Sequence, residues 1–204
     1  MTGVQTCALP ILSHYQRAKE LFELLGDTIG ITIALNNHGL ALRRDKSGDA
    51  EEVAVRRASA GALLSEALTL RRSLNDRRGL AETLNNLGVL SYELENYPGA
   101  WDYYLEALKY EQQIDNRHGV GVALANLGEV AGILGNACQG ARLLTAAERV
   151  LTEVGSPNLE EARKMMDDAC TVAAWSASEI SGHRESLRAL SVSECCDWAL
   201  GPMS

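Results

Sequence analysis

The sequence has few aromatic residues, and it lacks a basic excess and any long apolar run. Aromatic residues make up 5% of the chain, so Leu and Ala must fill most of the core that a 46% apolar content permits. A formal charge of −8 argues against a dedicated nucleic-acid or anionic-membrane binder, because such proteins concentrate Lys and Arg to neutralise phosphate. No apolar run approaches the roughly 20 residues that a membrane-spanning helix needs. We therefore expect a soluble, cytoplasmic protein that binds neither nucleic acid nor membrane.

Motifs for catalysis and metal binding are also missing. The chain has no phosphate-binding loop, no H-E-x-x-H zinc motif and no G-x-S-x-G nucleophile elbow. Acidic pairs such as Glu160-Glu161 point in different directions on a helix, which favours a charged face over an acid/base pair. The cysteines that follow Cys7 form no CxxC pair, which favours buried reduced thiols over a metal site. These cysteines are Cys138, Cys170, Cys195 and Cys196. We expect no enzyme activity, no cofactor and no metal site.

Residues 1–11 resemble the translation of a common short-read sequencing adapter rather than a signal peptide. This stretch has neither a charged start nor an apolar core of sufficient length. We therefore treat residues 1–11 as an artefactual leader and exclude them from the fold. It follows that we expect the natural N-terminus to be missing and the chain to be a fragment of a longer protein from an assembled metagenome.

A short pattern occurs three times with a period of about 40 residues. Its copies are Leu35-Asn36-Asn37-His38-Gly39, Leu84-Asn85-Asn86-Leu87-Gly88 and Leu124-Ala125-Asn126-Leu127-Gly128. A period in this range predicts stacked helical pairs, and apolar residues spaced three and four apart predict an all-α fold. His38 stands where the other copies have leucine, which predicts a half-buried packing side chain.

A helix-start signal precedes each copy. Asp27, Asp76 and Asn116 each stand three residues before a glycine, where the side-chain oxygen can accept a hydrogen bond from an exposed amide of the first turn. Glycine in the first turn costs up to about 1 kcal/mol relative to alanine. Its recurrence therefore predicts the close approach of a neighbouring helix. Within the second full repeat, Pro98 is expected at the first position of the second helix.

These residues resemble the tetratricopeptide repeat (TPR), a 34-residue helix-turn-helix. With Gly88 at the eighth position, Ala100, Tyr104 and Ala107 fall where that family places Ala, a large apolar or aromatic residue, and Ala. The residues that correspond for Gly39 and Gly128 are Ala60, Leu64, Ala67, Gly140, Leu144 and Ala147. The resemblance implies a solenoid of helical hairpins, wound as a right-handed superhelix, with a concave groove that binds a partner.

The first full repeat carries an insertion. Gly39 to Ala60 spans 21 positions, against 12 from Gly88 to Ala100, so nine residues are inserted. Extending the second helix backward by about two and a half turns would absorb them. We predict a partial repeat at 12–26, full repeats at 27–75, 76–115 and 116–155, and C-terminal capping helices at 156–204.

The C-terminal stretch resembles the tail of large bacterial LuxR-type transcriptional regulators with a signal-transduction ATPase module. The resemblance rests on residues 140–148, Ala174-Trp175 and residues 188–200. Ser191 and Glu194 have capping-box spacing, which predicts a last short helix. The resemblance implies an ATPase-coupled regulator whose repeat region senses a ligand. Two alternatives stay open: the repeat region of a larger enzyme, such as a cyclase or kinase, or a self-standing scaffold that forms homo-oligomers.

In the repeat family, the first helix of each pair lines the groove. The predicted groove residues are Asn36, Asn37, Arg43, Asn85, Asn86, Tyr92, Asn126 and Glu129. A ladder of amides can hydrogen-bond a peptide backbone as donor or acceptor. The same side chains can instead bridge neighbouring repeats, and both interpretations are open. The expected partner is a protein or peptide, or a small effector.

Overall fold

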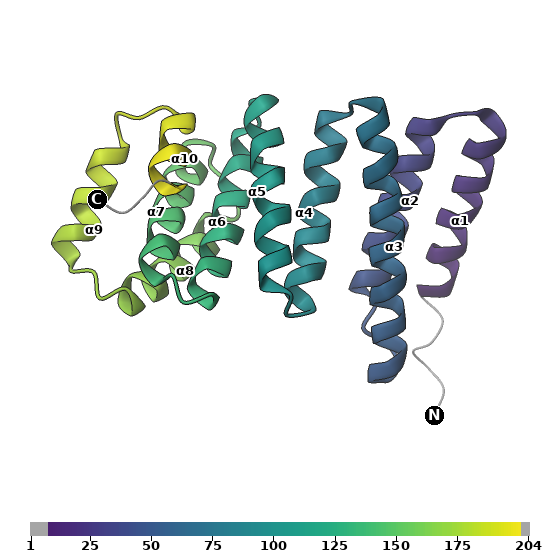
Figure 1. The fold of residues 1–204 in the computed structure, drawn as a ribbon, viewed down its shortest axis with the longest axis horizontal. Coiled ribbons are helices and arrows are strands. Elements are labelled where there is room, and N and C mark those ends of the chain that lie inside the picture. Colours follow the sequence, from purple (N-terminus) through teal and green to yellow (C-terminus); the bar gives the residue numbers. More distant parts are fainter. Residues whose placement is uncertain (1–7, 201–204) are drawn as a thin grey trace. The chain divides into compact units, whose positions relative to one another are not determined.

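The structure is a computed structural model in which residues 8–200 are described. Over these residues it has ten α-helices and no strand, which confirms the all-α prediction. The helices are α1 (Ala8–Leu25), α2 (Thr28–Arg44), α3 (Ala50–Leu74), α4 (Arg77–Glu93), α5 (Tyr97–Gln113), α6 (Arg117–Ile133), α7 (Ala137–Glu153), α8 (Leu159–Val172), α9 (Ala177–Leu187) and α10 (Val192–Leu200) (Figure 1). Helix α1 begins within the predicted leader, whose residues 1–7 lie outside the described range.

The chain separates into two compact units. One extends through Leu90 and the other begins at Ser91, so the division falls within α4. None of the helices in the described range is both long and apolar enough to cross a membrane.

In the first unit, α2 packs against both α1 and α3. The side chains of Ala60, Leu64 and Ala67 on α3 are fully buried. A Cβ at Gly39 on α2 would lie 2.9 Å from Leu64 Cγ and 3.2 Å from the carbonyl oxygen of Ala60. Gly39 therefore lets α2 and α3 approach each other closely, because any side chain at this position would push them apart.

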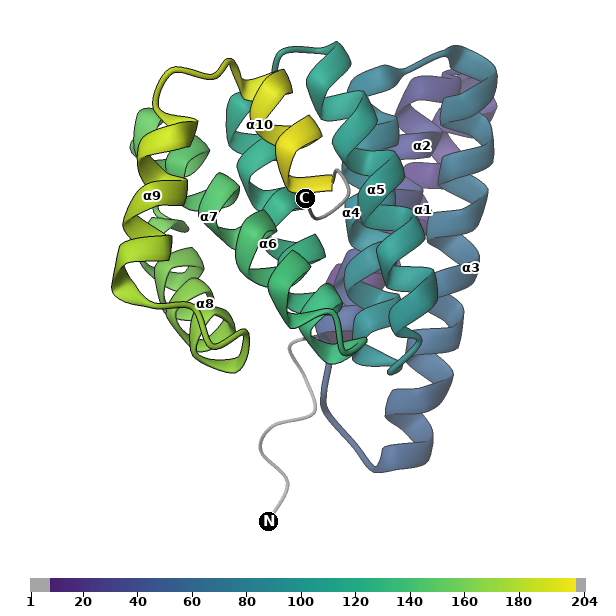
Figure 2. The ribbon, with the colours of Figure 1, turned by 60° about the vertical axis from the view of Figure 1, so that its left-hand side comes forward.

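The inserted residues extend α3, as the sequence predicts. Helix α3 has 25 residues, eight more than the 17 of α5 and of α7. It begins with a capping box in which Asp49 accepts from the amide of Glu52 and the Glu52 carboxylate accepts from the amide of Asp49. Figures 1 and 2 show its N-terminal end extending past α2.

The three predicted helix caps are confirmed. The side-chain oxygens of Asp27, Asp76 and Asn116 accept hydrogen bonds from the glycine amides three residues later, at 3.0, 3.0 and 3.3 Å. A Cβ at these glycines would collide with a side chain of the preceding helix. The side chains are Phe22 at Gly30, Arg71 at Gly79 and Glu111 at Gly119. At each of these glycines, the side chain that packs against the first helical turn thus comes from the residue eight positions earlier in the sequence.

In the second unit, α7 occupies the centre. It packs against α6, α8, α9 and α10, while α6 also packs against α5 (Figure 2). A Cβ at Gly140 on α7 would lie 2.8 Å from the carbonyl oxygen of Gly128 on α6. Backbone therefore meets backbone at the crossing of these two helices.

A buried carboxylate joins three helices of the second unit. Glu148 on α7 is 9% exposed, and its oxygens accept from Arg163 Nε of α8 at 3.1 Å and from Arg184 Nε of α9 at 2.8 Å. Charge-assisted bonds of this kind are stronger than neutral ones, particularly when partly desolvated. Glu148 thus holds α8 and α9 against α7.

Of three further local predictions, two are confirmed and one is wrong by one residue. His38 is half-buried as predicted, it stacks on Tyr15 with ring centroids 6.2 Å apart, and burial lowers its pKa. The capping box at Ser191 and Glu194 is confirmed, and α10 begins directly after Ser191. The position of Pro98 was wrong by one residue, because Asn96 caps α5 and Tyr97 takes the first helical position.

Candidate functional site

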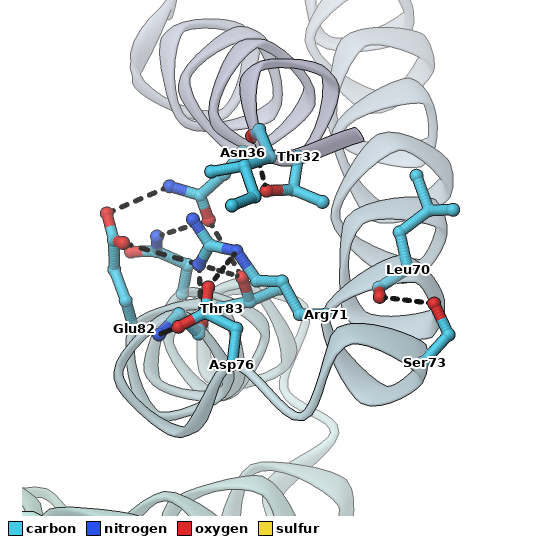
Figure 3. A network of polar contacts seen from close by, with 11 residues as sticks. Thr32, Asn36, Leu70, Arg71, Ser73, Asp76, Glu82 and Thr83 are labelled. Carbon is cyan, nitrogen blue, oxygen red and sulfur yellow. Dashed lines mark hydrogen bonds and ion pairs between the residues drawn. The ribbon is translucent and has the colours of Figure 1, made fainter. Parts of the chain in front are cut away.

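A polar network in the first unit contains two of the predicted groove residues, Asn36 and Asn86. Asn36 on α2 donates through Nδ2 to Glu82 Oε1 at 3.0 Å. Its Oδ1 accepts from the Thr83 hydroxyl and from Asn86 Nδ2, both at 3.2 Å. Figure 3 shows the side chains of Asn36, Glu82 and Thr83 meeting between α2 and α4. The amide of Asn36 therefore bridges helices of successive repeats.

The same network holds a buried guanidinium. Arg71 at the end of α3 is 2% exposed. Its Nη1 donates to the carbonyl of Gly79 and to Thr83 Oγ1, the latter at 2.6 Å, and lies 3.3 Å from Glu82 Oε2. Its Nε lies 3.8 Å from the carboxylate of Asp76, the cap of α4 (Figure 3). Removing one partner of a buried charge is costly, so the network fixes α4 against α2 and α3.

This geometry corrects the prediction for Asn36. With 1% of its surface exposed and both its amide oxygen and its amide nitrogen hydrogen-bonded, Asn36 does not face a guest molecule. Asn86 donates a hydrogen bond to Asn36, so this pair bridges two helices of the chain, which is the alternative to binding a partner. Asn37, Asn85 and Arg43 are half-buried, and their role in partner binding stays a prediction.

Tyr92 and Glu129 lie together in the second unit. The Tyr92 hydroxyl donates to Glu129 Oε1 at 2.6 Å, and its ring packs edge-on against Tyr97 with centroids 5.6 Å apart. Burial and the Glu129 carboxylate both raise the pKa of Tyr92 above its ordinary value. Tyr92 is therefore a neutral donor at physiological pH, and it fixes the orientation of the Glu129 side chain.

A cleft of about 90 Å³ lies between α6 and α8. Each helix lines it with a stripe of residues spaced i, i+3, i+4 and i+7, which share one helix face. The α6 stripe is Val122, Ala125, Asn126 and Glu129, and the α8 side is Asn158, Glu161, Ala162 and Met165. Leu151 of α7 completes the lining. Two of the eight predicted residues, Asn126 and Glu129, thus share one concave site.

The sequence motifs do not predict the α8 wall of this cleft. The pair Glu160-Glu161 predicts only a charged face, and no motif contains Asn158 or Met165. A signal for them exists in the spacing, because the same i, i+3, i+4, i+7 stripe recurs on both helices. At the edge of the cleft, His118 Nε2 of α6 lies 3.3 Å from Asn158 Oδ1, which joins the two helices.

A second hollow of about 360 Å³ lies where α5, α6 and α7 meet. It is lined by Pro98, Trp101, Asp102, Ala131, Leu134, Asn136 and Gln139. None of the predicted groove residues contributes to it. Its most prominent apolar groups are the half-buried Trp101 ring and the exposed Leu134 side chain.

Within residues 8–200, the buried cysteines are poor nucleophiles and no cluster of metal ligands forms. Cys170, Cys195 and Cys196 are buried, and burial raises the pKa of each thiol, to about 12 for Cys196. A thiol with a raised pKa supplies little thiolate, which is the nucleophilic form. Among residues 8–200, no three His, Cys, Asp or Glu side chains gather to hold a metal ion.

Comparison with solved structures finds a helical-repeat protein. The crystal structure of BtubC (BKLC) from P. vanneervenii matches with a TM-score of 0.53 at 14% sequence identity, over 94% of this chain and 79% of that one. At this identity the likeness shows the fold alone. No protein-family model and no curated protein matches the chain.

Proposed function

We propose that this chain is a non-catalytic binding module of TPR-like hairpins that recognises a protein or peptide at the cleft between α6 and α8. The observation that carries the proposal is the pair of matching stripes on these helices. Both stripes combine amide, carboxylate and small apolar groups, and they converge on one hollow. This combination suits a peptide, because amides and carboxylates can hydrogen-bond its backbone while apolar pockets accommodate its side chains.

The packing of two glycines supports the TPR-like hairpin. A Cβ at Gly39 or at Gly128 would lie within 3.0 Å of a leucine Cγ on the following helix, Leu64 or Leu144. Each would also lie near a backbone carbonyl of that helix, at 3.2 and 3.1 Å. These are the contacts expected when the small eighth residue of the repeat meets the second helix. The right-handed superhelix belongs to the same proposal.

The size of the cleft favours a peptide over a small effector. Pockets for drug-sized ligands measure roughly 300–1,000 Å³, whereas this cleft measures about 90 Å³. It can therefore enclose one side chain of a longer partner, whose remaining residues lie along the surface. The hollow beside Trp101, at about 360 Å³, falls within the small-molecule range and is the second candidate site, for a small apolar effector.

The parent protein belongs to the same proposal. The C-terminal resemblance supports a cytoplasmic, ATPase-coupled transcriptional regulator whose repeat region senses the partner. The alternatives, a larger cyclase or kinase and a self-standing homo-oligomeric scaffold, make different predictions. The upstream coding sequence would contain a phosphate loop for the regulator and a cyclase or kinase signature for the enzyme. Sedimentation of the purified chain would reveal the scaffold as an oligomer.

A peptide selection tests the proposed function. Random 12-residue peptides displayed on phage would be selected on the immobilised full chain. Enriched peptides should lose binding to Asn126→Trp, which fills the cleft. They should keep binding to Asp167→Trp, which places the same ring on an exposed part of α8 that faces away from the cleft stripe. Failure to enrich any peptide, or binding that survives Asn126→Trp, would contradict the proposal.

A further inference from the structure

The cleft between α6 and α8 carries an acidic lining. Its nine lining residues comprise two carboxylates, two amides and five apolar side chains, with no Lys or Arg. The carboxylates are Glu129 on α6 and Glu161 on α8. Resting on the proposed function, we infer that this cleft binds a Lys or Arg side chain of the partner peptide.

Glu129 is prepared to accept from a cation. One of its oxygens accepts from the Tyr92 hydroxyl at 2.6 Å, which limits the freedom of the carboxylate. A carboxylate offers about four lone-pair sites, so that bond leaves capacity for an ammonium or guanidinium group. Less side-chain entropy is lost when such a partner binds, because the acceptor is already held in place.

The neighbouring arginines pair with carboxylates outside the cleft. Arg163 on α8 pairs with Glu148 and Glu160, at 3.1 and 2.8 Å. Arg117 at the start of α6 lies 3.8 Å from Glu153. Both arginines are thus engaged by other acids, and the exposed Lys164 of α8 does not line the cleft, so Glu129 and Glu161 are the charged groups of the lining.

The apolar part of the cleft suits the stem of a long basic side chain. Ala125 and Ala162 have small side chains on facing helices, and Met165 has a flexible thioether that adapts to different shapes. Lys and Arg bury their methylene stems along apolar surface while the charged group stays polar. A volume of about 90 Å³ accommodates one such stem.

Substitution in the selected peptides tests this inference. Replacing the Lys of an enriched peptide by norleucine, or its Arg by citrulline, keeps the length and removes the charge. We expect binding to the full chain, measured by fluorescence anisotropy, to weaken at least fivefold. Glu161→Gln should weaken the basic peptide about two- to fivefold and leave its neutral analogue unchanged. Asp167→Asn removes an equal charge from the face of α8 that points away from the cleft stripe, and it should change neither.

The outcomes separate this inference from the proposed function. Cleft-dependent peptides without Lys or Arg, or equal binding of the basic peptide and its neutral analogue, would overturn the inference and leave peptide binding intact. A Glu161→Gln effect no larger than that of Asp167→Asn would also overturn it. The proposed function itself fails only if no enriched peptide depends on the cleft. Binding of the basic peptide should also fall with added salt, because charge attraction is screened.

Discussion

Replacing Gly140 by alanine tests how closely α6 and α7 approach. A Cβ at this position would lie 2.8 Å from the carbonyl oxygen of Gly128 and 3.2 Å from the amide nitrogen of Gly132. Both atoms belong to the backbone of α6, so no rotamer change relieves the contact and the helices must move apart. The corresponding residues of the other repeats, Ala60 and Ala100, are fully buried alanines. The repeat pattern alone therefore predicts that alanine is tolerated, whereas the structure predicts a loss.

Two opposing effects set the size of that loss. Replacing glycine by alanine inside a helix gains about 1 kcal/mol of propensity. Overpacking a well-filled interior costs typically about 1–3 kcal/mol. A contact of 2.8 Å with backbone is severe, so we take a cost of about 2–3 kcal/mol from that range. The net destabilisation is about 1–2 kcal/mol, which lowers the urea midpoint by about 0.5–1 M for a slope near 2 kcal/mol per M.

Urea unfolding followed by far-UV circular dichroism measures the effect. Gly132→Ala is the matched control, because it lies on the same helical hairpin and its Cβ would meet nothing within 4 Å. Only the propensity gain applies there, so its midpoint should stay the same or rise. A Gly140→Ala protein at least as stable as the unsubstituted chain would refute the close backbone approach of α6 and α7.

Three further predictions test single features. Asn116→Ala removes the cap acceptor of α6 and should cost about 1 kcal/mol in urea unfolding, whereas Asn136→Ala should cost little because Asn136 makes no capping bond; equal losses would contradict this assignment. Iodoacetamide should alkylate buried Cys196 far more slowly than half-buried Cys138, since burial raises the pKa of Cys196 to about 12; similar rates in peptide mass spectrometry would show that Cys196 is accessible. Hydrogen bonds from the capping serine lower the pKa of Glu194 from its ordinary 4.5. The folded value is the lower one, so its contribution to stability is present above pH 4.5 and is lost as the pH falls through the folded pKa; an NMR titration that gives 4.5 or higher would contradict the capping box.

The helix starts were predictable from the sequence because they depend on neighbouring residues. Asp27, Asp76 and Asn116 each reach a glycine amide only three residues away, so the signal and its partner lie in the same short segment. The long α3 was predictable for a similar reason, since an insertion of known length can extend a helix without changing its packing. Pro98 was misplaced by one residue, because two adjacent positions both tolerate proline at a helix start.

The hydrogen-bond partners of the buried polar side chains were not predictable from the sequence. Asn36 was placed in the groove, yet it is buried against Thr83 and Asn86, which lie 47 and 50 residues away. The repeat register predicts which face of α2 carries Asn36 but not which residues of α4 lie opposite. Arg71 illustrates the same limit. It fills the space over Gly79 that Phe22 and Glu111 fill at the corresponding glycines, so the position recurs while the residue type changes.

The α8 wall of the cleft depends on contacts that only the folded chain supplies. Helix α8 is amphipathic, so its pattern indicates which face is buried but not which helices that face meets. Ala162 and Met166 are buried, and Arg163 between α8 and α7 pairs with Glu148; together these contacts fix the rotation of α8. One residue of slip would turn the helix by about 100° and remove Glu161 from the cleft. The acidic lining, and with it the inferred preference for a basic side chain, therefore depends on how α8 packs against α7.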